Sequence, residues 1–255
     1  LTWGETYLFS LFGFATHGLL DACTSYGTQL FWPFSDDRIS WNYISVVDPF
    51  LTIPVIFTII FTILMKNKLI SIFGIFYIAV YLSFGAFQEN RAEKAGQAIS
   101  NLRGHVSKNL TVKPSLGNLF LWKTIYEFDG FYYVDAVRLF HTSEFCKGTI
   151  IKKLDLSNEF LALNKISQQF KDIKRFEWFS QGYLGKKIDS NIITDVRYSA
   201  VPNEVDGLWG IEINQKKDNN EHVDWVVNRS NYPKKWERFL DLLLGKNCQN
   251  LLIKN

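Results

Sequence analysis

The stretch PFLTIPVIFTIIFTILMKNKLISIFGIFYIAVYLSFGAFQ, residues 49–88, decides the fold class of this protein. It contains two charge-free runs, residues 49–65 and 69–88, and each is long enough to cross a bilayer at about 1.5 Å per residue. Residues 66–68 form a tight turn between them with two positive charges, and aromatic residues lie near the ends of the second run. The pattern predicts a transmembrane helical hairpin. A buried helical hairpin of a soluble protein is the alternative.

A third membrane helix is predicted before this hairpin, at residues 6–20, which are apolar apart from His17 and small hydroxyl residues. By the positive-inside rule, Lys66 and Lys68 place the turn of the hairpin in the cytoplasm. The loop at residues 25–48 and everything after Gln88 would then lie on the opposite side of the membrane.

The charged residues divide the chain into two unlike parts. Residues 1–88 contain only eight charged side chains, whereas residues 89–255 contain 25 basic and 20 acidic ones. We therefore expect a transmembrane helical module of about three helices at 1–88 and a soluble, β-rich α+β domain at 89–255. Because the chain starts at Leu1 and its single methionine is Met65, we also expect it to be a fragment of a longer protein, with no removable signal peptide at its start.

The soluble part has recognisable elements of both kinds. Residues 119–140 alternate in polarity and are divided by Asp129-Gly130, a strong β-hairpin signal because both turn positions tolerate positive φ. Strands are also predicted at 191–200, 207–213 and 222–228, and helices at 89–102, 157–176 and 233–244, the last opened by Pro233.

The three cysteines, Cys23, Cys146 and Cys248, are widely separated and odd in number. No CxxC or Cys/His pair is present, so the sequence predicts isolated thiols rather than a disulfide framework or a thiolate zinc site.

Two ionisable residues interrupt the apolar start of the chain. His17 and Asp21 are four residues apart, so on a helix they share one face, and Thr24 lies on the same stripe. An imidazole and a carboxylate are good ligands for Zn²⁺ or a similar divalent ion, and ionisable residues in membrane segments are functional candidates. A hydrogen-bonded His–Asp pair without a metal fits the spacing equally well.

The loop after this segment adds further polar residues, predicted to lie at the same depth relative to the membrane as His17 and Asp21. Asp36, Asp37 and Arg38 follow the helix, and Asp48 precedes Pro49 at the start of the next helix. A guanidinium beside carboxylates and a metal suits an anionic substrate such as a phosphate ester. The alternatives are a salt bridge of Arg38 with Asp36 or Asp37 and a helix N-cap for Asp48, which we expect whether or not Asp48 also serves the metal.

The stretch HGLLDACTSYGTQLFWPFSDDRISWNYISVVDPF, residues 17–50, resembles the signature of the YdjM-like family of inner-membrane metal-dependent hydrolases. The shared pattern is HxxxDxxTxxGT, then PFS-x-x-R, then an Asp that opens the next membrane helix. The resemblance continues more weakly over residues 112–140 and 193–213.

This resemblance implies a multi-pass protein of the bacterial inner membrane that binds a divalent metal, which we expect to be zinc. His17 and Asp21 would be ligands, Arg38 and Asp48 catalytic groups, and Thr24 and Asp36 residues that support the ligands. Family members usually have an earlier segment that supplies more ligands, which we expect to precede Leu1, because a catalytic zinc normally has three protein ligands.

Two functions follow from these observations. One is a membrane-embedded metal-dependent hydrolase that acts on a phosphate ester or lipid-linked substrate at the membrane surface. The other is a non-enzymatic, membrane-anchored binding or assembly protein whose aromatic-rich soluble domain engages a partner and whose His17–Asp21 pair is structural. The small basic excess does not predict nucleic-acid binding. The other histidines, His105, His141 and His222, are predicted to be surface or packing residues.

Overall fold

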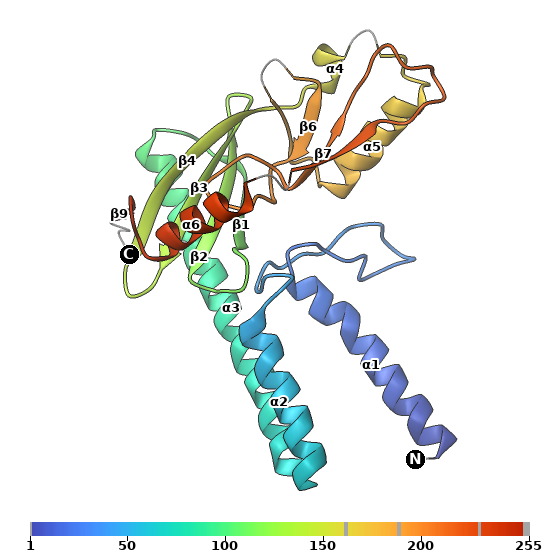
Figure 1. Ribbon diagram of the computed structural model, residues 1–255, viewed down its shortest axis with the longest axis vertical. Coiled ribbons are helices and arrows are strands. Elements are labelled where there is room, and N and C mark those ends of the chain that lie inside the picture. Colours follow the sequence, from blue (N-terminus) through green and yellow to red (C-terminus); the bar gives the residue numbers. More distant parts are fainter. Residues whose placement is uncertain (1, 161–162, 188–189, 229–230, 252–255) are drawn as a thin grey trace. The chain divides into compact units, whose positions relative to one another are not determined.

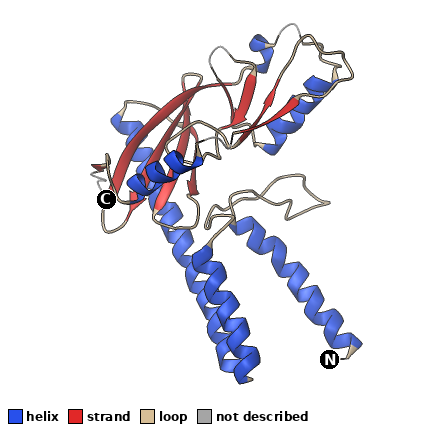
Figure 2. Cartoon of the chain, viewed as in Figure 1, coloured by secondary structure: helices blue, strands red, loops and turns tan. Residues whose placement is uncertain are grey.

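The computed structural model describes residues 2–160, 163–187, 190–228 and 231–251. Its contacts divide the chain into two units. The helical unit contains Leu1–Arg91 and Lys113–Phe120, and the β-rich unit contains Ala92–Val112 and Leu121–Asn255. Figure 2 shows the long helices of the helical unit and the strands of the β-rich unit.

Three long helices form the start of the chain: α1 (Trp3–Cys23), α2 (Pro49–Met65) and α3 (Lys68–Leu102). The predicted bounds of α2 are confirmed. The two helices predicted at residues 69–88 and 89–102 are one continuous helix of 35 residues. In Figure 1, α2 and the first half of α3 run side by side as a hairpin.

Only one of the described helices, α3, is both long and apolar enough to cross a membrane by length and composition. The α2 helix is as apolar but has 17 residues, which is short for such a test. The α1 helix has 21 residues but does not pass the same test, and it includes Glu5, His17 and Asp21. The expectation of about three spanning helices is therefore supported for α3 alone.

Small residues allow α2 and α3 to approach closely. A Cβ atom at Gly74 would lie 2.7 Å from the Oγ1 of Thr58, and Ser71 donates a hydrogen bond to Thr62 across the hairpin at 3.1 Å. Close approach through glycine and interhelical hydroxyl bonds is typical of helices that pack within membranes.

Residues 113–120 return from the first strand of the sheet to the helical unit. The buried ammonium of Lys113 donates to the carbonyl oxygen of Ser25 at 3.0 Å and to the Oδ1 of Asn42 at 2.9 Å. The backbone N–H of Gly117 donates to Ser45 at 3.0 Å. The loop between α1 and α2 is therefore held by a segment more than sixty residues further along the chain.

The β-rich unit is built on one nine-stranded sheet. Its strands follow the order β1-β2-β3-β4-β5-β6-β7-β8, with β9 paired to β4, and the pairs from β2 to β8 are antiparallel. The strands are β1 (Lys108–Pro114), β2 (Leu121–Phe128), β3 (Phe131–Leu139), β4 (Ser143–Lys153), β5 (Leu184–Lys186), β6 (Ile192–Asp195), β7 (Trp209–Glu212), β8 (Asp224–Val227) and β9 (Gln249–Asn250).

The predicted Asp129-Gly130 hairpin is confirmed. It joins β2 to β3 with Phe128 opposite Phe131, and both turn residues have positive φ, 49° and 76°. This backbone matches the right-handed twist of the two strands.

Three shorter helices complete this unit: α4 (Leu156–Glu159), α5 (Gln168–Phe179) and α6 (Tyr232–Leu243). The single helix predicted at 157–176 is wrong, because Ser167 starts a new helix as the N-cap of α5 and accepts from the N–H of Phe170. The predicted opening of the last helix by proline is confirmed in α6.

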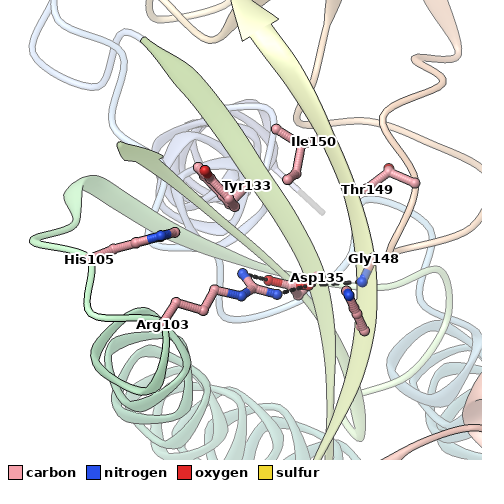
Figure 3. Close-up of a pocket in the computed structure, with 8 residues that line it drawn as sticks. Arg103, His105, Tyr133, Asp135, Gly148, Thr149 and Ile150 are labelled. Atoms are coloured by element: carbon pink, nitrogen blue, oxygen red, sulfur yellow. Dashed lines mark hydrogen bonds and ion pairs between the residues drawn. The ribbon is translucent and has the colours of Figure 1, made fainter. Parts of the chain in front are cut away.

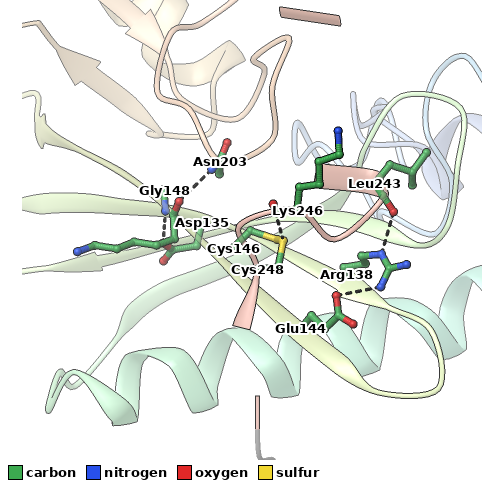
Figure 4. Close-up of a disulfide and its surroundings, with 10 residues drawn as sticks. Asp135, Arg138, Glu144, Cys146, Gly148, Asn203, Leu243, Lys246 and Cys248 are labelled. Carbon is green, nitrogen blue, oxygen red and sulfur yellow. Dashed lines mark hydrogen bonds and ion pairs between the residues drawn. A yellow bond between two sulfur atoms is a disulfide. The ribbon is translucent and has the colours of Figure 1, made fainter. Parts of the chain in front are cut away.

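The expectation of isolated thiols is wrong for two of the three cysteines. Cys146 on β4 and Cys248 beside β9 form a disulfide across 102 residues, and Cys23 alone is free and buried. Figure 4 shows the disulfide close to the ion pair of Arg138 with Glu144. Cys146 belongs to a core cluster with Phe239 and Leu242 of α6, so the bond joins the end of the chain to the central strands.

Candidate functional site

The first candidate site lies on the last turns of α1 in the helical unit. The Nε2 of His17 and the Oδ2 of Asp21 are 3.3 Å apart, and the two side chains are 70% and 47% exposed. The helix therefore does bring the predicted imidazole and carboxylate together, on a face open to the surroundings.

This separation can be tested against a metal. Zinc is bound at about 2.0–2.2 Å by imidazole nitrogen and carboxylate oxygen, so two ligands of a tetrahedral ion lie roughly 3.4 Å apart. The His17–Asp21 distance fits this edge of a tetrahedron, and it also fits a direct ion pair. No group of three or more potential metal ligands occurs among the residues that the structure describes. The pair therefore supplies two ligands, which is one fewer than a catalytic zinc usually has.

Thr24 acts on the backbone of this site. It is the C-cap of α1, and both its N–H and its hydroxyl donate to the carbonyl oxygen of Asp21, at 3.0 and 2.8 Å. It fixes the end of the helix that carries the carboxylate, without contacting the carboxylate itself.

The predicted loop residues lie beyond the helix end. The guanidinium of Arg38 donates to the carbonyl oxygens of Tyr26 and Gly27 at 2.9 and 3.0 Å. Asp37 accepts a hydrogen bond from the hydroxyl of Ser35 at 2.9 Å, and Asp36 and Asp37 are both exposed. The loop thus places one cation and two carboxylates near the end of α1.

Asp48 is buried and is a confirmed N-cap of α2. Its Oδ1 accepts from the N–H groups of Phe50 and Leu51, and the hydroxyl of Tyr81 on α3 lies 2.9 Å from both carboxylate oxygens. These contacts give Asp48 a structural role. The catalytic role expected from the sequence stays a prediction.

Tyr81→Phe tests that structural role. It removes the hydroxyl bonded to a buried carboxylate, and we expect a loss of about 1.5–3 kcal/mol in the stability of the helical unit. Tyr77→Phe is the matched control, since its hydroxyl bonds the neutral carbonyl of Phe50 and should contribute less. The measurement is the loss of helical circular dichroism during denaturant titration of the full chain in detergent. Equal effects of the two substitutions would argue against a special role for the Asp48 contact.

The second candidate site is a pocket of about 360 Å³ in the β-rich unit. Figure 3 shows its side chains, which come from the segment after α3 and from two neighbouring strands. The lining residues are Arg103, His105, Tyr133, Asp135, Lys147, Gly148, Thr149 and Ile150.

A buried ion pair forms one wall of this pocket. Both guanidinium nitrogens Nη1 and Nη2 of Arg103 contact Asp135, at 2.6 and 2.9 Å, and the N–H of Gly148 donates to the same carboxylate at 2.8 Å. Burial by itself would lower the pKa of Arg103, but its hydrogen bonds with Asp135 and Tyr126 outweigh burial and raise the pKa above its usual value. Arg103 therefore keeps its charge, and two bonds between planar groups orient it on Asp135.

A β-bulge shapes the same wall. The register of β3 and β4 shifts between Val134 and Ala136, where Asp135 faces Lys147 and Gly148. A Cβ atom on Gly148 would lie 2.0 Å from the carbonyl oxygen of Val134, so only glycine fits there. Bulges often direct side chains into functional sites, and this one brings the Gly148 N–H to Asp135.

His105 was expected to be an ordinary surface or packing residue. Its ring does pack, since it stacks on Phe128 with centroids 4.0 Å apart, and its Nδ1 also lies 3.0 Å from the hydroxyl of Tyr126. Tyr126 also accepts from Arg103 at 3.0 Å. Since these partners are on distant parts of the chain, no local spacing in the sequence could have revealed the arrangement.

For His222 too, the sequence shows no potential partner at a suitable spacing. Its Nδ1 lies 2.8 Å from the Oδ2 of Asp172, fifty residues earlier in the chain.

Residues 2–92 match the model of a protein family described as YdjM inner membrane protein. The resemblance inferred from residues 17–50 is therefore confirmed, and the match covers α1, α2 and most of α3. No curated protein and no solved structure matches the chain. That description names an inner membrane protein, which agrees with the apolar helix α3 in the matched segment.

Proposed function

We propose that this protein is a membrane-embedded, metal-dependent hydrolase that acts on a phosphate ester or lipid-linked substrate at the surface of the inner membrane. The observation that carries the proposal is the His17–Asp21 pair, whose 3.3 Å separation fits two zinc ligands on a helix of the YdjM-matching segment.

In this proposal, His17 and Asp21 hold a divalent ion, which we take to be zinc, together with at least one ligand from outside the pair. When bound, such an ion polarises a phosphoryl oxygen and lowers the pKa of water. Thr24 and Asp36 support the ligands, Thr24 by fixing the backbone of Asp21.

Arg38 is the proposed group for an anionic substrate. Its bonds to the carbonyl oxygens of Tyr26 and Gly27 fix the guanidinium beside the loop that follows the site. A guanidinium held in place by two backbone carbonyls supports electrostatic stabilisation of a phosphoryl group. Asp48 keeps its predicted catalytic role in this proposal, with Tyr81 and two backbone N–H groups holding its carboxylate in place.

The proposal includes three membrane crossings, by α1, α2 and α3. A helix of 17 residues is about 25 Å long, within the range of short spanning helices. Most side chains of α1 are exposed, including Phe9, Phe12 and Phe14, as expected of a helix that contacts lipid or another protein.

Two independent features support the orientation that we propose for the chain in the membrane. Lys66 and Lys68 favour a cytoplasmic turn between α2 and α3. The Cys146–Cys248 disulfide favours an oxidising compartment for the β-rich unit, and such compartments lie outside the cytoplasm. Both features support our proposal that the β-rich unit lies on the outer side of the inner membrane.

Metal content tests the proposal directly. We expect the purified full-length protein to retain about one zinc or similar ion per molecule, and His17→Ala and Asp21→Ala each to lose it, because each removes a ligand. His141→Ala, which changes an exposed histidine in the β-rich unit, is the control and should leave the content unchanged. Elemental analysis after exhaustive dialysis gives the stoichiometry.

A wild-type full-length protein without metal, or a metal content that survives both substitutions, contradicts the proposal. Hydrolysis of a lipid phosphate ester in mixed micelles should then follow metal content across the same variants. Failure of this second assay would leave the non-enzymatic binding or assembly protein as the better function. That alternative is favoured by the lack of a third metal ligand near the pair among the described residues.

A further inference from the structure

The pocket of the β-rich unit has hydrogen-bond donors on several sides and no carboxylate oxygen left to repel an anion. Asp135 is the one carboxylate among its lining residues, and its side chain is 2% exposed. Arg103 contacts both of its oxygens, and Gly148 donates to one of them. The negative charge of Asp135 is therefore balanced within the wall.

The proposed site uses one of the two tautomers of His105. Tyr126 accepts from Arg103, and in this tautomer it donates its own hydroxyl proton to the Nδ1 of His105. Burial raises the pKa of Tyr126, which keeps that proton in place. In the neutral ring, the proton then lies on Nε2. His105 thus presents an N–H donor, and Figure 3 shows its ring directed towards the space between Arg103 and Tyr133.

Two more donors line the pocket. Tyr133 contributes a phenolic hydroxyl, and its ring is stacked on Tyr126 with centroids 5.1 Å apart, which restrains its position. Lys147 is exposed, and no described residue pairs with its ammonium group. Since Arg103 and Asp135 balance each other, Lys147 makes the pocket net positive.

The kind of anion follows from the geometry of these donors. The planar fork of Arg103, which matches a carboxylate in two parallel bonds, is already engaged by Asp135. The remaining groups are an imidazole N–H, a hydroxyl and an ammonium, which are single donors on separate residues. Such a set suits the several oxygens of a tetrahedral phosphate better than a flat carboxylate.

We propose that this pocket binds a phosphate monoester, with His105, Tyr133 and Lys147 as the donors to its oxygens. Its volume of about 360 Å³ is at the small end of the range for ligand sites, so it accepts a headgroup or a small metabolite. The Ile150 side chain gives the ester group an apolar contact at the wall. This site is separate from the His17–Asp21 pair and does not depend on a metal there.

Equilibrium dialysis of the full chain in detergent, with radiolabelled inorganic phosphate and glycerol phosphate, tests the site. We expect saturable binding of both, with weaker competition from acetate. Lys147→Gln removes one charged donor and should weaken binding roughly tenfold or more. Tyr133→Phe removes one neutral donor and should weaken it about threefold to tenfold.

Lys171→Gln is the matched control, because it removes an equal charge from the exposed surface of α5. Absence of saturable binding, an unchanged affinity in Lys147→Gln, or an equal loss in Lys171→Gln would overturn the proposal. Acetate that competes as well as phosphate would overturn the assignment to phosphate.

Two further arms identify the source of the ligand and separate this site from the proposed metal centre. In phosphatidylcholine nanodiscs, added phosphatidic acid should displace glycerol phosphate if the natural ligand is a lipid headgroup, and should not if it is soluble. Binding should persist with a chelator and in His17→Ala. Loss under either condition would show that the anion binds at the metal centre instead, and would overturn the separate site.

Discussion

Cys248→Ser is expected to lower the stability of the β-rich unit by about 4–5 kcal/mol. The Cys146–Cys248 bond closes a loop of 102 residues, and the loop-entropy model gives about 4.7 kcal/mol for a loop of that size. Cys248 is the better of the two positions to change, because it is half-buried whereas Cys146 lies in the core at 1% exposure. The measurement is the urea midpoint of the full chain, followed by the circular dichroism of the sheet.

Reductant provides the internal control for this substitution. Dithiothreitol should shift the midpoint of the wild-type chain to that of Cys248→Ser and should leave the variant unchanged. Cys23→Ser should keep the wild-type response to reductant, since Cys23 is free. If the wild-type midpoint does not respond to reductant, the disulfide contributes nothing to stability.

Lys123 gives the second large effect, through the pH dependence of folding. This lysine lies on β2 with its side chain 4% exposed, and its amine donates to the Oγ of Ser199 and to the carbonyl oxygen of Glu204, both at 2.8 Å. Burial lowers the pKa of Lys123 from 10.5 to about 7, although Asp195 and Glu204 act in the opposite direction. A neutral amine has two N–H donors, and both have an acceptor here.

The direction in which stability changes with pH follows from the number of protons that Lys123 binds in the folded and in the unfolded chain. Between pH 7 and about 10, the unfolded chain holds a proton on Lys123 that the folded chain lacks, so stability rises with pH across this window. Each pH unit contributes about 1.4 kcal/mol, which amounts to roughly 3 kcal/mol between pH 7 and 9.5. The gain in stability is complete only above the pKa of Lys123 in the unfolded chain, and it is lost as the pH falls to about 7. The upper limit of 9.5 avoids the ionisation of tyrosines.

Urea midpoints of the sheet signal at several pH values check this expectation. Lys123→Met should remove most of the slope, because no amine then titrates in the core. Lys171→Met, at an exposed position of α5, should retain the slope of the wild-type chain. Parallel slopes for all three proteins would show that Lys123 stays charged in the folded state.

Local patterns predicted the elements whose causes are local. The charge-free run that ends at Lys66 and the Asp48-Pro49 start set the bounds of α2, and both are visible in a few consecutive residues. The β2–β3 hairpin follows from a two-residue turn for the same reason. The continuity of α3 was missed because its composition changes at Gln88, although its backbone has no reason to stop there.

The disulfide could not be read from spacing. Cys146 and Cys248 meet only because α6 packs on the central strands and returns the chain to β4, where Glu144 and Phe145 pair with β9. Those contacts are decided by tertiary packing.

The two candidate sites also differ in whether their residues meet through local spacing or through tertiary packing. His17 and Asp21 are one helical turn apart, so their meeting was predictable from the spacing alone. His105 needs Tyr126 and Arg103, and Arg103 needs Asp135, 32 residues later on β3. Such a network appears only once the sheet is assembled, which is why the pocket was not foreseen.

The position of Lys113 has a consequence for the biogenesis of this protein. Its amine is the buried link to Ser25 and Asn42, but it is translated some twenty residues after the end of the YdjM-matching segment. During synthesis, the loop after α1 must therefore wait for the ribosome to pass residue 113 before it can acquire its final shape. A gene fragment cut at residue 92 would encode both His17 and Asp21, yet its product would lack the cation that orders the neighbouring loop.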